Sequence, residues 1–571
     1  MNQRVHQGCE PCRPWQTALA KVQGSATRRG EGEVRTAWFS LRTAAIASLF
    51  TALAIALMTM ATVGVFSITA AAETDRGFRT LWFEIQVIDA ETGRGVPLVE
   101  LRTTDGDLYV TDSAGRVALL DLSLMGQRVY FHVSSHGCDL PADGFGYKGK
   151  AIDIEPGGKA VIEIQRMNIA ERLYRVTGRG IYRDSVLLGY DVPLRQPLIN
   201  SQVAGQDSVQ AVVHNGRIYW FWGDTDRVSY PLGNFRTTGA VSELPQNGGL
   251  DPSLGVDLHY FTDPSTGFVR SMAPQPSAAG NLMWIDRLIS VPDADRVQRL
   301  VGRYFQQAGL DKNVGNGLLV FNEELGMFEI LRQDLDLREP WQTTRGHSTA
   351  THYYDPETGE PYWLFARPWP VIRVAAVQQP EAYESFTPLQ PGTSFRGADT
   401  LIERNAAGEV VWDWKPNTEP ISQQQEKMLI EFGLLRPEEA RFQLRDVDSG
   451  DEVVIHGASV RWNEYRQKWI MIGNQVGGRS SYLGEVWYAE ADSPTGPWRW
   501  AKRIATHDGY SFYNPTQHAF FDQEGGRYIY FEGTYTNQFT GGTPPTPLYD
   551  YNQIMYRLDL ADPRLTLPDG P

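Results

Sequence analysis

The chain has 571 residues, which is too long for one ordinary domain and predicts two or three. Its formal net charge of −15 argues against nucleic acid as a partner, because binding to phosphates needs clustered lysine and arginine. The 16 Trp and 25 Tyr residues favour neutral polar ligands such as sugars, since these side chains offer flat apolar faces with polar handles.

The first 72 residues predict a targeting or anchoring segment. Residues 1–42 carry seven Lys or Arg against three Glu, and residues 43–72 contain no charge and are long enough to span a bilayer. The run ends in Ala70-Ala71-Ala72, which fits the cleavage site of a signal peptide, whereas its length favours a retained anchor. Both alternatives place the remainder outside the cytosol, as a secreted, periplasmic or membrane-anchored protein.

Residues 80–168 predict a small β-sandwich. Short runs of period two, such as FEIQVID and RVYFHVSS, alternate with turns that contain glycine. The pattern V-x-D-x-E-T-G-x-x-V-P, followed by T-D-S-A-G-R, resembles the prealbumin-like regulatory domain found beside carboxypeptidases and carbohydrate enzymes. Residues 169–200 are expected to form a linker, with one strand-like piece from Leu173 to Tyr182.

Residues 201–562 repeat a strand, a turn and an aromatic strand. Self-similar all-β units of this kind predict a β-propeller, and five copies are expected, the poorest between Asn281 and Leu331. Residues 420–445 are expected to be a helical insertion. Four residues stand eight positions before their turn residue and are therefore expected to ring one mouth of the channel: Asp207, His347, His456 and Asn514.

The first copy places two carboxylates together. Asn215-Gly216 is a strong hairpin signal, with Asp207 just before the first strand and Asp224 just after the second. An antiparallel hairpin returns the chain to the end it left, so both side chains are expected at one rim. Two carboxylates at one cleft can perform general acid/base chemistry on a glycosidic bond. The alternative is that both aspartates only cap turns.

Further polar residues are expected at the same mouth of the channel. A third strand opens at Glu485, and strand alternation turns Glu532 away from the rim, which makes it a weaker candidate. Each of these groups could instead stabilise neighbouring sheets through hydrogen bonds. The residues predicted to bind substrate are His347, His456, Asn514, Arg367, Asn474, His518 and Glu532.

Tryptophans divide into two predicted classes. Trp220, Trp222 and Trp363 lie in strands and are expected in the core. Trp341, Trp412 and Trp414 lie in loop-like regions and are better placed to serve as sugar platforms.

Three segments resemble a known enzyme superfamily: WFWGDT (220–225), AEADSPTGPWRW (489–500) and NPTQHAFFD (514–522). They are similar to segments of the five-bladed propeller glycosidases, which include arabinanases, levansucrases and invertases, to glycoside hydrolase family 43, and to the propeller endo-D-arabinanases. The resemblance covers roughly residues 201–560. It implies that Asp207 is the general base or nucleophile.

The general acid is not where that family pattern implies. The family has carboxylates at the starts of later blades, where this chain has histidine or asparagine. Three alternatives remain: Asp224 first, Glu485 second, and a histidine, His456 or His347, third.

The sequence thus predicts an exported glycoside hydrolase acting on a polysaccharide or oligosaccharide, possibly one with furanose or pentose units. The alternative is a non-catalytic carbohydrate-binding or adhesion propeller, because a fold alone does not confer activity. A lyase or phosphorylase is a third and weaker alternative. The sequence has no P-loop, no dinucleotide-binding motif and no H-E-x-x-H zinc motif, so no cofactor is expected. A structural calcium at the channel axis stays an open alternative.

Overall fold

The computed structural model describes residues 81–274, 281–293, 295–309, 312–333, 350–365, 368–379 and 382–568. The chain divides into two compact units after Arg76, and all described residues belong to the second. The predicted basic segment and the apolar run 43–72 lie outside the described residues. No helix in the described part is long and apolar enough to cross a membrane.

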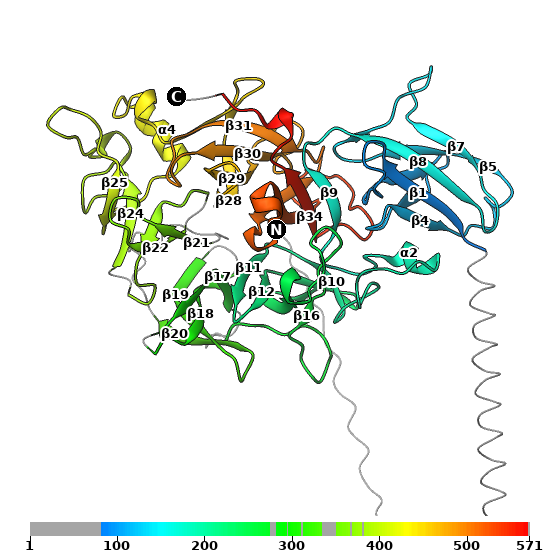
Figure 1. Cartoon of the computed structure of the whole chain (residues 1–571), viewed down its shortest axis with the longest axis horizontal. Coiled ribbons are helices and arrows are strands. Elements are labelled where there is room, and N and C mark those ends of the chain that lie inside the picture. Colours follow the sequence, from blue (N-terminus) through cyan, green and yellow to red (C-terminus); the bar gives the residue numbers. More distant parts are fainter. Residues whose placement is uncertain are drawn as a thin grey trace, which may run out of the picture. The chain divides into compact units, whose positions relative to one another are not determined.

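The period-two runs of the N-terminal region form two four-stranded sheets, ordered β4-β1-β8-β6 and β3-β2-β5-β7 (Figure 1). Apolar residues of both sheets, such as Ile85, Ile162 and Phe131, share one buried core, which makes the region a sandwich. The strands are β1 (Phe83–Asp89), β2 (Glu100–Thr103), β3 (Leu108–Val110), β4 (Arg116–Leu119), β5 (Arg128–Ser134), β6 (Cys138–Asp139), β7 (Gly149–Asp153) and β8 (Lys159–Arg166).

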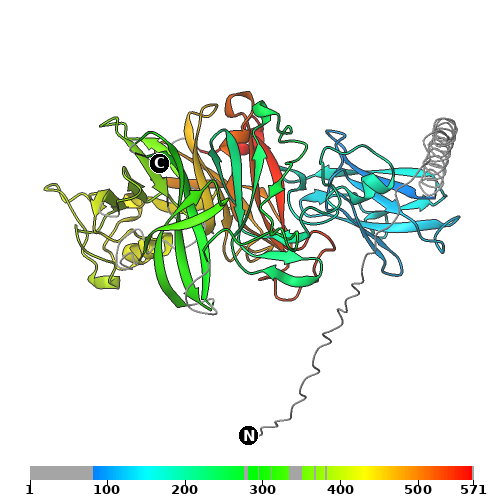
Figure 2. The same ribbon diagram turned by 90° about the horizontal axis from the view of Figure 1, so that it is seen from below.

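Five sheets of four to six strands follow the sandwich along the chain (Figures 1 and 2). The first two are β11 (Gln210–His214), β12 (Arg217–Trp222), β15 (Thr238–Glu243) and β16 (His259–Tyr260), and then β17 (Asn281–Pro292), β18 (Gln298–Ala308), β19 (Lys312–Asn322) and β20 (Met327–Gln333). The third contains β21 (Thr351–Tyr354), β22 (Pro361–Phe365), β23 (Ile372–Val374), β24 (Tyr383–Thr387) and β25 (Asp413–Pro416).

The last two sheets include strands that are distant in sequence. The fourth is ordered β28 (Ile455–Asn463), β29 (Lys468–Gln475), β30 (Val486–Ala491), β31 (Trp498–Ala505), β26 (Phe442–Asp446) and β27 (Glu452–Val453). The fifth is ordered β32 (Ser511–Gln517), β33 (Tyr528–Thr536), β34 (Asn552–Asp559) and β9 (Glu171–Arg175). A small sheet of β10 (Val203–Gln206), β13 (Thr225–Arg227) and β14 (Tyr230–Asn234) lies beside the first.

The five sheets surround one cavity of about 240 Å³. Each sheet contributes a lining residue, namely Gln210, Ser290, Trp363, Arg461 and Gln517. Hydrogen bonds join neighbouring sheets, for example from Gln210 Nε2 to the Ile285 carbonyl (3.2 Å) and from the Gln517 N–H to Ser459 Oγ (2.8 Å). This all-β arrangement fits a β-propeller.

Strand β9 completes the last sheet from the N-terminal side. It pairs antiparallel with β34, with Tyr174 opposite Met555, and all five of its residues are buried. An ion pair at 2.5 Å between Arg557 Nη2 and Glu171 reinforces the pairing. The segment expected to be a linker therefore completes the fifth sheet.

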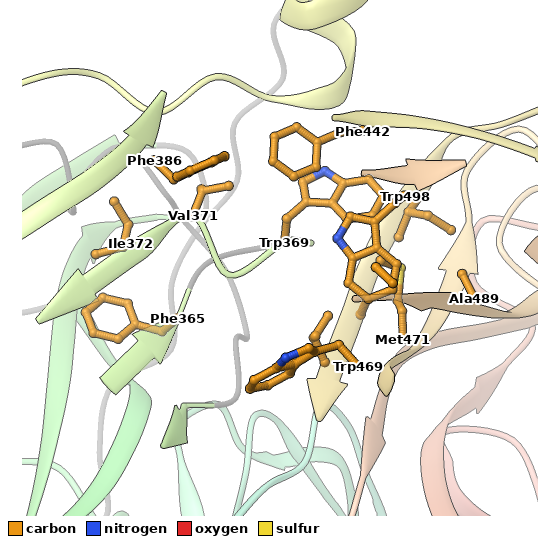
Figure 3. Close-up of a cluster of buried hydrophobic side chains, with 14 of the residues drawn as sticks. Phe365, Trp369, Val371, Ile372, Phe386, Phe442, Trp469, Met471, Ala489 and Trp498 are labelled. Atoms are coloured by element: carbon orange, nitrogen blue, oxygen red, sulfur yellow. The ribbon is translucent and has the colours of Figure 1, made fainter. Parts of the chain in front are cut away.

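An aromatic cluster joins the third and fourth sheets (Figure 3). The Trp369 ring stacks on Phe442 with centroids 5.1 Å apart and lies 6.1 Å from Trp498, the last residue of the SPTGPW segment. That segment therefore contributes to the core. Trp412 and Trp414, predicted as sugar platforms, both pack on Phe386 instead, because the chain around them forms a strand against β24.

The predicted helical insertion is only partly helical. Residues Gln423–Glu431 form α4, which begins with a capping box between Ser422 and Gln425. The rest of the segment includes β26, which pairs parallel with β31. A second short helix, α2 (Arg183–Leu187), lies in the predicted linker.

Candidate active site

The first hairpin brings the two predicted carboxylates together. Strands β11 and β12 pair from Gln210–Phe221 to His214–Arg217, and Asn215 and Gly216 form the turn with φ of 48° and 76°. Beyond the strands, the Gly223 N–H donates to the Asp207 carbonyl at 2.8 Å, and the Asp207 N–H donates to the Asp224 carbonyl at 3.3 Å. Asp207 and Asp224 therefore lie at one rim, as the hairpin signal predicts.

The Asp207 carboxylate is surrounded by donors. Its Oδ1 accepts the Asp224 N–H at 2.8 Å, and its Oδ2 accepts the Tyr513 hydroxyl at 2.9 Å and the Ser208 hydroxyl at 3.2 Å. Burial raises the pKa of Asp207, whereas these donors act in the opposite direction. Gly223 leaves room for this arrangement, since a Cβ there would lie 2.2 Å from Oδ1.

Asp224 has a different environment. Its Oδ1 is buried and has no hydrogen-bond partner among the residues that the structure describes. Burial, and then the neighbouring charge of Asp207, raise the pKa of Asp224 to about 8. At neutral pH Asp224 therefore keeps its proton, and its carboxyl accepts fewer hydrogen bonds than that of Asp207. Two carboxyl groups with such different environments suit an acid and a base.

Tyr551 contacts both carboxyl groups. The Tyr551 side chain interacts with Asp207 and with Asp224, and each interaction lowers the pKa of that carboxyl. Burial also raises the pKa of the nearby Asp226, and Asp550 adds to that effect. The rim is thus acidic. Among the described residues, no lysine or arginine contributes noticeably to the pKa shifts of these three aspartates.

Two of the predicted rim residues lie at β-bulges on innermost strands. Asn514, with φ of 52°, interrupts the pairing of β32 between Tyr513 and Thr516, and its Nδ2 donates to Ser208 Oγ at 2.8 Å. His456 interrupts β28 in the same way, between Ile455 and Gly457. Asn514 thus joins the Asp207 environment through Ser208.

Asn474 is fully buried at the end of β29, opposite Gly457. Neither polar atom of its side-chain amide has a hydrogen-bond partner among the described residues. A buried amide in this state retains its full capacity for water or for a ligand hydroxyl.

The remaining described candidates have partners of their own. Glu485 accepts from Ser480 Oγ and forms an ion pair with Arg503 at 3.1 Å, and no bond links it to the two aspartates among the described residues. Glu532 and His518 bond to each other at 2.8 Å with side-chain exposures of 0% and 1%. These two side chains do not reach solvent. His347 and Arg367 lie outside the described residues.

Sequence reasoning missed Asp286. This residue starts a bulge of β17, between Asp286 and Ile289, with Arg287 at φ of 54°. Asp286 is 1% exposed, its Oδ1 is buried without a partner, and burial raises its pKa against the influence of Arg287 and Arg303. The signal was an acidic residue in the first strand of the poorest copy, in the run NLMWIDRLISV.

Tyr513 and Tyr551 were also missed. Tyr513 directly precedes Asn514, which is predicted to lie at the rim, so its position in the sequence was a usable signal. Tyr551 reaches the site from a loop more than 300 residues beyond the hairpin, and no local pattern marks it. No group of three or more metal-ligating side chains that could hold an ion occurs in the described part of the chain.

No family model and no curated protein matches the sequence. Solved structures that align with the chain include an exo-β-1,3-galactanase from Clostridium thermocellum (10% identity, 64% of this chain and 60% of that chain, TM-score 0.31). An α-L-arabinofuranosidase from Fusarium graminearum aligns at 10% identity over 69% of this chain and 99% of that chain (TM-score 0.32). An exo-1,5-α-L-arabinanase from a bovine ruminal metagenomic library aligns at 10% identity over 62% and 93% (TM-score 0.30).

These neighbours are glycoside hydrolases, and those compared include members of family 43, the family that the sequence motifs resemble. The chain spans 60% of the length of the galactanase that it matches. Because the TM-scores are 0.32 or lower, the case for function rests on the chain's own side chains rather than on these alignments.

Proposed function

We propose that the chain is a glycoside hydrolase on a five-bladed β-propeller, with Asp224 as general acid and Asp207 as general base or nucleophile. The observation that carries this proposal is the contrast within one rim. Asp207 is oriented by donors from Asp224, Tyr513 and Ser208, whereas the pKa of Asp224 is raised to about 8. A carboxyl that stays protonated at neutral pH beside an oriented carboxylate is what acid/base cleavage of an acetal requires.

The chemistry follows from these two states. Asp224 donates its proton to the leaving glycosidic oxygen as the bond to the anomeric carbon breaks. Asp207 either removes a proton from the attacking water or attacks the anomeric carbon itself. A separation of about 5 Å between the carboxyl groups gives retention, and about 6.5–9.5 Å gives inversion. The acidic rim stabilises the positive charge that develops on the sugar ring in both cases.

A second candidate function has one observation in its favour. The Asp207 carboxylate accepts the backbone N–H of Asp224, as an aspartate that only caps a turn would do. In that case the propeller binds carbohydrate without cleaving it. For either function we propose that residues 43–72 direct the chain out of the cytosol, as a signal or an anchor.

The test is a panel of polysaccharides with detection of released sugar. The panel includes β-1,3-galactan, α-1,5-arabinan and xylo-oligosaccharides, assayed with wild type, Asp207→Asn and Asp224→Asn. We expect each variant to lose about 10²–10⁴-fold in kcat. For Asp224→Asn, the loss should shrink on aryl glycosides whose leaving group needs no protonation.

The pH profile supplies a second test. Because the acid must be protonated, wild-type kcat should fall as the pH rises through about 8, the pKa of Asp224. Glu485→Gln is the matched control and should retain wild-type kcat. Undiminished hydrolysis by Asp224→Asn would refute its assignment, and binding without hydrolysis by the wild type would establish the second function.

A further inference from the structure

The loop that precedes β34 connects the sandwich to the two carboxyl groups. This loop, residues 537–551, is called the strap below. Tyr549 lies near its end, and Tyr551 is its last residue. Because these two tyrosines are only two positions apart, contacts that hold Tyr549 in place also limit the movement of Tyr551.

Tyr549 is bound to the sandwich. Its hydroxyl donates to the Thr111 carbonyl at 2.7 Å and accepts the Leu98 N–H at 3.2 Å. All three residues are buried. The Arg175 guanidinium lies over the Tyr549 ring, 4.8 Å from its centroid. A buried hydroxyl that both donates and accepts is fixed in orientation, and each partner is costly to leave unpaired.

A second connection to the sandwich runs through residues at the two ends of the strap. Asp550 Oδ1 accepts the Tyr510 hydroxyl at 2.7 Å and the Asn537 N–H at 2.6 Å. The Tyr510 ring stacks on Tyr535 with centroids 4.0 Å apart. The Tyr535 hydroxyl and Nε2 of His136, a sandwich residue, are hydrogen-bonded at 2.8 Å.

The backbone of the strap is held at the carboxylate end. Leu548 and Tyr551 have φ of 66° and 58°, a conformation that non-glycine residues keep only where the surroundings enforce it. The Asn552 side chain donates to the Asp550 carbonyl at 2.9 Å. The Tyr551 carbonyl approaches Gly205 so closely that a Cβ there would be 2.4 Å away. Tyr551 is therefore presented to Asp207 and Asp224 in one orientation.

We propose that the sandwich is part of the catalytic unit: by fixing Tyr549, it positions the Tyr551 side chain beside Asp207 and Asp224. Tyr549 and Tyr551 are thus positioning residues. The inference rests on the proposed function for its effect on turnover, and on geometry alone for its effect on the carboxyl groups. It assigns to the sandwich a role that a spacer or an accessory binding module would not have.

The experiment uses the full chain with Tyr549→Phe, and Tyr182→Phe as the matched control. Tyr182 is also buried, and its hydroxyl donates at 2.7 Å to the carbonyl of Leu254, a residue outside the strap. Two readouts are taken: the pH profile of kcat, and the titration of the Asp224 carboxyl carbon by ¹³C NMR, assigned with Asp224→Asn. The second readout needs no substrate.

Loss of the anchor should loosen Tyr551 and weaken its interaction with Asp224, which lowers the pKa of that carboxyl. We expect Tyr549→Phe and Tyr551→Phe to raise that pKa by about one unit, with the alkaline limb of kcat moving to higher pH by the same amount. We also expect kcat to fall about tenfold in Tyr549→Phe, with a smaller change in KM. Tyr182→Phe should leave both readouts at their wild-type values.

An Asp224 titration unchanged in a folded Tyr549→Phe protein would overturn the inference. If this variant does not fold, Tyr510→Phe provides the same comparison, because it removes the bond to Asp550. A wild type that hydrolyses nothing refutes the proposed function, whereas the NMR titration still decides whether the sandwich positions Tyr551.

Discussion

Gly223→Ala tests the position of Asp207 without altering any functional group. The added Cβ would lie 2.2 Å from Asp207 Oδ1, and ordinary contact begins at 3.4 Å. The carboxylate must therefore move by about 1.2 Å, and a misplacement of about 1 Å can cost about 10²-fold in rate. Gly223 is not among the glycines with positive φ, so alanine introduces no backbone strain. We expect kcat/KM to fall about 100-fold.

The assay measures kcat and KM on the polysaccharide that the wild type hydrolyses best, together with the melting temperature. Gly315→Ala is the control, because its Cβ meets only ordinary contacts at 3.6 Å within β19. Wild-type turnover by Gly223→Ala would show that the observed Asp207 position is not the reactive one. If the activity of Gly223→Ala falls only in proportion to its folded fraction, the loss is one of stability, and the predicted displacement of Asp207 is equally refuted.

Two further predictions concern stability. His136 is neutral in the folded protein because burial lowers its pKa to about 4, so the unfolded chain binds more protons between pH 4 and 6.5. The free energy of unfolding should fall by at most about 3 kcal/mol as the pH decreases through that window, and His136→Gln should reduce this slope in urea titrations. Leu173→Ala should cost about 2–5 kcal/mol because Leu173 is fully buried in β9, whereas Leu122→Ala, at an 87% exposed site, should change stability by less than about 0.5 kcal/mol. Equal effects of the two leucine variants would contradict the role of β9 in completing the fifth sheet.

Local signals in the sequence were sufficient for the hairpin and for the sandwich strands. Asn215-Gly216 fixes the turn by its tolerance of positive φ, and this alone places Asp207 and Asp224 at one rim. Periodicity likewise located strands such as β1 and β5, whose alternate residues are buried. These features depend on residues a few positions apart.

The remaining features depend on contacts between distant segments. Nothing near β9 shows that it pairs with β34, because a short buried strand has the same pattern beside any neighbour. The positions of Trp412 and Trp414 depended on whether their loop pairs with β24, which composition does not reveal. The two tyrosines that contact Asp207 come from the last sheet and its strap.

The proposed chemistry of the two aspartates is therefore a property of several sheets together rather than of the hairpin. The hairpin brings the carboxyl groups together, but Tyr513, whose hydroxyl donates to Asp207, and Tyr551, which interacts with both aspartates, arrive only when the fifth sheet packs against the first. That sheet is in turn completed by β9, the strand that follows the sandwich. Two carboxylates bracketing a hairpin could equally cap turns, and the proposed acid/base pair needs groups from the far end of the chain. The site thus uses segments that are far apart along the chain: the strand that follows the sandwich, the hairpin and the last sheet. It therefore depends on the whole fold.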